Sequence, residues 1–111
     1  MQMSTKAAMA VAAGLTATTI GPVLAEETAD FYRAKTLQLI VGYGPGGGND
    51  VYARLLARHM GRHLPGSPAI VVQNMPGAGS LVAANTIANT AAKDGTTFGT
   101  FARNLPIASV V

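Results

Sequence analysis

The 111-residue sequence contains no cysteine and no tryptophan. Without cysteine there is no disulfide scaffold, thiolate metal cluster, nucleophilic thiol or lipid attached through an N-terminal cysteine. Charge is also scarce, because only 12% of the residues are charged and the formal net charge is +3. The basic residues are spread from Lys6 to Arg103 rather than clustered, which does not favour a nucleic-acid partner. This length allows one small domain at most and excludes a multidomain enzyme.

The first 25 residues have the layout of a secretory signal peptide. Met1–Lys6 carries one positive charge, and the Ala-rich run Ala7–Ile20 carries none. Gly21–Pro22 is expected to break any helix just before Val23–Ala25, whose small or modest side chains suit a signal peptidase. We therefore predict cleavage before Glu26 and export to the periplasm. The uncharged run is shorter than the roughly 20 apolar residues of a spanning helix, which disfavours a membrane anchor.

The rest of the chain alternates between strand and helix patterns. β-rich apolar runs predict strands at Thr36–Val41 and Ala69–Gln73, and a weaker alternation predicts a third strand at Thr96–Phe101. Small residues predict a helix over Ser80–Ala92 between the second and third strands. Strands joined by single helices imply parallel pairing. The predicted fold class is therefore α/β, an incomplete βαβαβ piece of a parallel sheet with its third strand near an edge.

A further helix is predicted between the first two strands. Asn49 and Asp50 are good N-cap residues, and Pro65–Gly66 ends the pattern. The apolar residues at helical spacing are Val51, Leu55, Leu56, Met60 and Leu64. Because the third strand has no successor, we expect the chain to be the N-terminal piece of a longer protein, with a self-sufficient small domain as the alternative.

Two glycine-rich loops, Tyr43–Asp50 and Asn74–Ser80, follow the first two strands and run straight into helices. Ligands bind at that rim of open parallel sheets, where glycines allow close approach and the first helical amides are unpaired donors. Because the strands are expected to be neighbours, the loops should lie side by side and favour an anion. Tyr43 would add an aromatic wall, and neutral polar groups would come from Asn49, Asn74 and Ser80. The alternative is a purely structural role, in which the glycines serve only tight turns.

Gly42-x-Gly44-x-x-Gly47 also fits a dinucleotide fingerprint, so the alternative hypothesis is an N-terminal fragment of a Rossmann-type dinucleotide-dependent oxidoreductase. That function usually needs an acidic residue at the end of the second strand, where this chain has Gln73 and Asn74. Pro45 inside the motif and the predicted signal peptide also count against it.

Residue patterns for other kinds of functional site are absent or incomplete. His59 and His63 have a metal-capable spacing, but Met60 stands where a zincin pattern needs Glu, so no metal site is predicted. No nucleophile with an adjacent base can be assembled, so neither an enzyme nor a bound cofactor is predicted. A basic stripe is interpreted as a solvated helix face; it comprises Arg54, Arg58 and Arg62.

Four motifs follow one another in a specific order, namely Gly44–Asp50, Ala53–Ala57, Val71–Ser80 and Asp94–Thr96. Together they resemble the substrate-binding proteins of tripartite tricarboxylate transporters, also called the Bug family. The resemblance spans Phe31–Phe101 and implies a type II periplasmic binding fold of two lobes. Members of this family are exported bacterial proteins that close over small carboxylates and present them to a membrane transporter.

The resemblance implies that residues 1–25 are a signal peptide and residues 26–111 are the N-terminal part of the first lobe of a solute-binding protein. It implies a monomer whose partners are a small carboxylate and membrane transporter subunits. Asp50 is expected to cap its helix and fix the first loop, and Tyr43-Gly44 departs from the Phe-Pro of many members. The ligand-binding residues that it implies are Tyr43, Pro45, Gly46, Gly47, Asp50, Gly77, Ala78 and Ser80.

Overall fold

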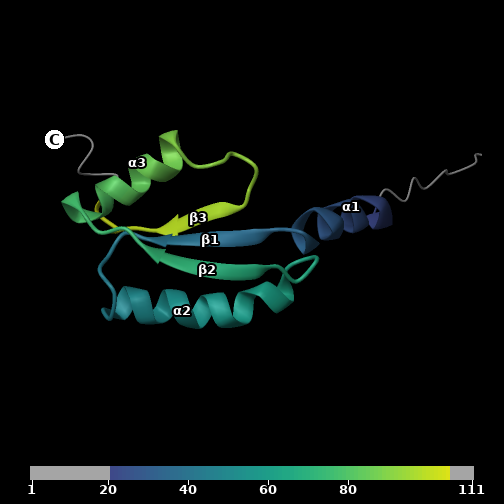
Figure 1. Cartoon of the computed structure of the whole chain (residues 1–111), viewed down its shortest axis with the longest axis horizontal. Helices are drawn as coiled ribbons and strands as arrows, with labels where there is room; N and C mark the ends of the chain where they lie inside the picture. The colour runs from purple at the N-terminus through teal and green to yellow at the C-terminus, as the bar shows by residue number, and fades with distance from the viewer. Residues whose placement is uncertain (1–20, 106–111) are drawn as a thin grey trace, which may run out of the picture.

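The structure of the chain is a computed structural model that describes residues 21–105 (Figure 1). Three strands, β1 (Thr36–Val41), β2 (Ala69–Asn74) and β3 (Thr97–Thr100), form one parallel sheet in the order β2-β1-β3. These bounds agree with the predicted strands to within one residue at each end, and the parallel pairing and the edge position of β3 are confirmed.

Helices cover both faces of this sheet. Helix α2 (Gly48–Met60) lies against one face and α3 (Leu81–Asn89) against the other, as Figure 1 shows. Short 3₁₀ turns, η1 (Gly61–His63) and η2 (Ala78–Ser80), adjoin them. The α/β fold class is thereby confirmed as a three-stranded parallel layer with helices on either side.

The core lies around the central strand. β1 has a hydrogen-bonded neighbour on each side, and its Leu39 and Val41 side chains are almost completely buried. Ala53 of α2 packs onto them, because a small side chain lets the helix approach the sheet closely. Tyr43, Ile70, Val72 and Phe98 are partly buried against this cluster.

The start of α2 differs from its prediction. Gly47 is the N-cap residue and makes no side-chain capping bond, so Asn49 and Asp50 stand in the first helical turn rather than at the cap. The apolar residues whose spacing indicates this helix do not form its buried face either. Val51 is 57% exposed and Leu55 is 50% exposed, whereas Asp50 and Ala53 are buried.

A helix that the sequence analysis did not predict, α1 (Gly21–Arg33), precedes the sheet. The expected helix break at Gly21–Pro22 is wrong, because both residues are helical in α1. A side chain on Gly66 would overlap the Ala29 carbonyl of α1, so glycine is required at this contact, where φ is +77°.

The predicted signal peptide lies mostly outside the described residues, which begin at Gly21, and the predicted cleavage bond falls within α1. Of the helices in the described part of the chain, none has the length and apolarity needed to cross a membrane.

Candidate functional site

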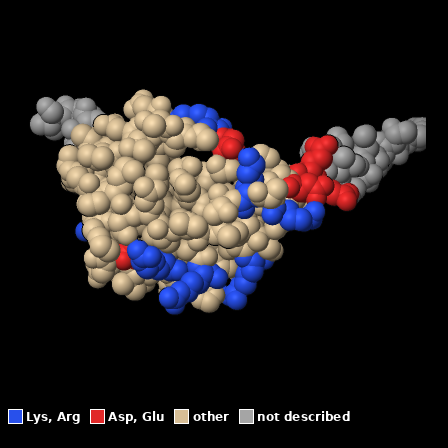
Figure 2. Space-filling model, in the orientation of Figure 1, with Lys and Arg blue, Asp and Glu red and all other residues tan. Residues whose placement is uncertain are grey.

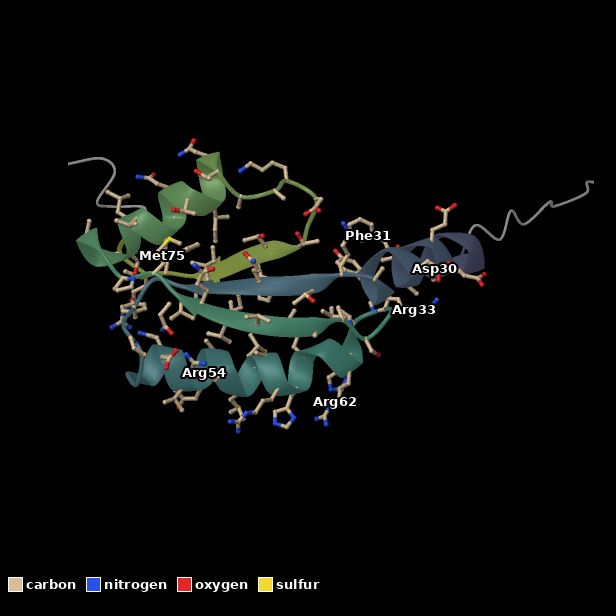
Figure 3. The ribbon with its side chains drawn as sticks, in the orientation of Figure 1. Asp30, Phe31, Arg33, Arg54, Arg62 and Met75 are labelled. Carbon is tan, nitrogen blue, oxygen red and sulfur yellow. The ribbon has the colours of Figure 1, made fainter. Side chains whose placement is uncertain are left out.

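The carboxyl ends of the strands form a single rim. The Met75 N–H donates to the Val41 carbonyl over 2.8 Å, and the Gly42 N–H donates to the Thr100 carbonyl over 3.0 Å. These bonds extend both strand pairings past the last strand residues, so the chain segments that follow β1, β2 and β3 leave the sheet together. Figure 3 shows Met75 at this rim and Arg33 of α1 at the opposite end of the sheet. The prediction that the two glycine-rich loops lie side by side is confirmed.

A buried carboxylate joins the two loops. Asp50 is 3% exposed, and its Oδ2 accepts hydrogen bonds from the Gly46 N–H at 2.9 Å and from Arg54 Nε at 3.1 Å. Its Oδ1 accepts a bond from Asn74 Nδ2 at 2.8 Å, and the same Nδ2 also donates to the Tyr43 carbonyl at 3.0 Å. Asp50 therefore fixes the first loop as expected, although it does not cap the helix.

These contacts set the charge of Asp50. The Gly46 N–H, then the Arg54 guanidinium and the Asn74 amide, hold the pKa of the Asp50 carboxyl at about 2, below its usual value of 3.8. The carboxylate is thus ionised at neutral pH, and its charge is balanced by the Arg54 guanidinium beside it. An anion approaching the first loop meets an ion pair rather than an isolated negative charge.

Arg54 has a role that the sequence analysis missed. Its stripe is exposed as interpreted, but Arg54 also holds the two loops together, because its Nη2 donates to Asn74 Oδ1 at 2.9 Å. The i, i+4 spacing of Asp50 and Arg54 was the available signal. Figure 2 shows the basic side chains gathered over α2, and Figure 3 shows Arg54 near its rim end and Arg62 at its far end.

The second loop is held by a buried hydroxyl. Ser80 is 1% exposed, and its Oγ donates to the Gly42 carbonyl at 2.9 Å. A Cβ on Gly42 would lie 2.6 Å from both Cβ and Oγ of Ser80, so only glycine allows this close approach. Backbone φ is positive at Gly77, Ala78, Gly79 and Ser80. A positive φ at the non-glycine residues Ala78 and Ser80 is unfavourable and persists only where the surrounding structure enforces it. The Ser80 hydrogen bond is one such constraint.

A cavity opens at the rim between the first loop and the end of β3. It has a volume of about 300 Å³ and is lined by Tyr43, Asn49, Phe101 and Arg103. Tyr43 and Asn49 were predicted to contribute to the site, whereas Phe101 and Arg103 were not. The available signal was that Phe101 ends the third predicted strand and Arg103 follows two residues later. The predicted second-loop residues Gly77, Ala78 and Ser80 do not line this cavity.

Among residues 21–105, no three His, Asp or Glu side chains come together as a metal site. The end of β2 carries the Asn74 amide, whose hydrogen bonds are directed to Asp50, Tyr43 and Arg54. β2 ends in Asn74 and not in the acidic residue that a dinucleotide-binding sheet usually carries at this point.

Comparison with curated proteins finds three relatives. The chain is 42% identical over 86 residues to the protein BugT of Bordetella pertussis, a match that covers 78% of this chain and 26% of BugT. It is 42% identical over 69 residues to a UPF0065 protein of the same bacterium, covering 62% of this chain and 20% of the relative. It is 33% identical over 81 residues to a UPF0065 protein of Cupriavidus necator, covering 73% and 24%.

The matches thus span about a quarter of the length of these relatives or less. No protein-family model matches the chain. No solved structure matches it either.

Proposed function

Because the matched part of this chain is related to the Bug and UPF0065 proteins, we propose that it is part of the solute-binding component of a tripartite tricarboxylate-type transporter. Residues 26–111 would form the N-terminal part of the first lobe. The ligand is a small carboxylate, and the protein delivers it to membrane transporter subunits without catalysing a reaction. Its place of action is the periplasm, reached by means of the signal peptide in residues 1–25.

The observation that carries this proposal is the tie between the two loops through Asp50 and Asn74. The tie holds the first loop at the N-terminus of α2, where the first helical N–H groups lack intrahelical acceptors. Such donors, at the positive end of the helix dipole, favour a negatively charged group. The site can therefore bind a carboxylate, directly or through bridging water, without a dedicated catalytic residue.

The proposed ligand contacts come from both loops. Gly46 and Gly47 are exposed in the first loop, where a ligand can approach the backbone. Tyr43 lines the neighbouring cavity and supplies a ring and a hydroxyl. Asp50 and Ser80 support these contacts from beneath, because both are buried and hydrogen-bonded within the protein. The remaining proposed contacts are Pro45, Gly77 and Ala78.

The test is a titration of the isotope-labelled chain with acetate, succinate, citrate and NAD, followed by NMR. We expect the carboxylates to shift the backbone amides of residues 43–50 and 77–80, and NAD to leave them unchanged. A response to NAD and to no carboxylate would replace this proposal with the dinucleotide alternative. NMR suits the experiment because it detects weak binding, which is what a single partial lobe is expected to show.

Export is tested separately by mass spectrometry of the chain recovered from a periplasmic extract. We expect the mature chain to begin at Glu26. Recovery of only the uncleaved chain in the cytoplasm would contradict the proposed location.

A further inference from the structure

We propose that Arg103 is the cationic anchor that holds one end of the ligand in the carboxylate site. The inference rests on the proposed carboxylate-binding function and adds a specificity-determining residue to it. It starts from the cavity at the rim, which brings the Arg103 side chain together with Tyr43, Asn49 and Phe101.

The sheet places Arg103 at this rim. β3 pairs with β1 in a register that sets Thr100 opposite Val41, and the Gly42 N–H continues that pairing by donating to the Thr100 carbonyl. Tyr43 and Phe101 therefore leave neighbouring strands at the same level. Directly after Phe101 the chain turns, with the Leu105 N–H donating to the Ala102 carbonyl at 3.1 Å. Arg103 lies inside this turn and borders the cavity.

Arg103 differs from the other cations of the described chain in its position, because it is the one arginine or lysine that lines the rim cavity; Arg58 and Arg62 also lack a carboxylate partner, but neither borders this cavity. Arg33 pairs with Asp30, Arg54 with Asp50, and Lys35 lies 4.0 Å from Asp94. Lys93 donates to two carbonyls near the end of α3. No carboxylate within residues 21–105 pairs with Arg103. The cavity wall therefore carries one positive charge that has no counter-ion among residues 21–105.

The chemistry of the cavity indicates its ligand. A guanidinium binds a carboxylate through two parallel hydrogen bonds and keeps its charge at all relevant pH values. A volume of about 300 Å³ suits a small molecule. Asn49 belongs to the first turn of α2, so a molecule in the cavity also borders the helix N-terminus. A dicarboxylate would use both features, with one carboxylate on Arg103 and the other at the amides of the first loop.

The test compares succinate binding to the wild-type chain and to Arg103→Gln by NMR titration. We expect Arg103→Gln to weaken succinate binding by about 10- to 100-fold, as loss of a charge-assisted hydrogen bond predicts. Arg58→Gln is the matched control, because Arg58 is an exposed arginine on α2 that borders other cavities, and it should leave binding unchanged.

Two further measurements keep the inference testable if Arg103→Gln folds poorly. Arg103→Lys keeps the charge but lacks the planar fork, so it should retain intermediate affinity for succinate. In wild type, the Nε–H resonance of Arg103 should shift on succinate addition. If succinate shifts the first-loop amides equally in wild type and Arg103→Gln, the role of Arg103 is overturned while the proposed function stands. If no carboxylate shifts any rim amide of wild type, both proposals are overturned.

Discussion

The side-chain amide of Asn74 donates a hydrogen bond to the carboxylate of Asp50 across 2.8 Å, although 24 residues separate them in sequence. Asn74 ends β2 and Asp50 lies in the first turn of α2, so this bond joins the ends of two elements at the rim. It also leaves the second oxygen of the carboxylate to the Gly46 N–H and Arg54. The shape of the first loop thus depends on a residue at the start of the second.

Replacing Asn74 by alanine is expected to loosen the first loop. The change removes the donor to Asp50 Oδ1 and to the Tyr43 carbonyl, leaving a buried acceptor without its partner. Such a loss costs about 1–3 kcal/mol, so hydrogen exchange at the Gly46 N–H should quicken by about 10-fold or more. Asn89→Ala is the control, because that amide donates only to an exposed helix carbonyl. An unchanged exchange rate at Gly46 would show that Asp50 holds the loop without Asn74.

Acid should weaken the hydrogen bonds that Asp50 accepts from Gly46, Arg54 and Asn74. The pKa of Asp50 is about 2 in the folded chain against an ordinary value of 3.8, so the unfolded chain binds a proton at higher pH than the folded one. The stabilisation is complete above about pH 4 and is lost as the pH falls towards 2. Bonds from the Thr96 side chain and N–H also lower the pKa of Asp94, which acts in the same direction. Circular dichroism between pH 5 and pH 2 should show a smaller acid loss in Asp50→Asn; an identical acid loss would contradict this role.

Gly47→Val separates ligand access from folding. Gly47 has φ −79°, and a Cβ there would meet no heavy atom closer than 3.9 Å, so valine should fit the fold while blocking close approach of a carboxylate to the loop. Carboxylate binding by NMR should disappear in this variant and persist in His59→Ala. Gly79→Val is less informative, because φ is +61° there and valine would strain the backbone. Binding that survives Gly47→Val would remove the first loop from the site.

The chain is expected to be poorly stable by itself. Its buried apolar residues within the described range are few, and they cluster on β1. Large apolar side chains on α2 stay in contact with water, with Tyr52 74% exposed and Leu56 48% exposed. Thermal unfolding of the chain should therefore be broad, and an apolar dye should bind before the transition. A sharp cooperative transition in a monomer, without dye binding, would show that this core suffices.

Much of the site could be predicted from sequence, because it follows from where strands end. The apolar runs and the glycines after them identify the β1 and β2 ends, and their parallel order brings both loops to one rim. The motifs in these loops carry the resemblance to the Bug family that the relatives confirm. The helix at Gly21–Arg33 was missed, because glycine followed by proline usually disfavours a helix, whereas both residues are helical here.

The strands, the parallel layer and the positions of the loops follow from the amino-acid sequence, because hydrophobic periodicity and turn residues act over a few neighbouring positions. The partners of the polar side chains depend on how these elements pack together. Asp50 meets Asn74, and Arg103 borders the cavity beside Tyr43, because separate strands end at the same level. Contacts of this kind depend on sheet register and helix rotation. The local spacing of residues in the sequence specifies neither the register nor the rotation, because it does not depend on which distant residue completes the contact.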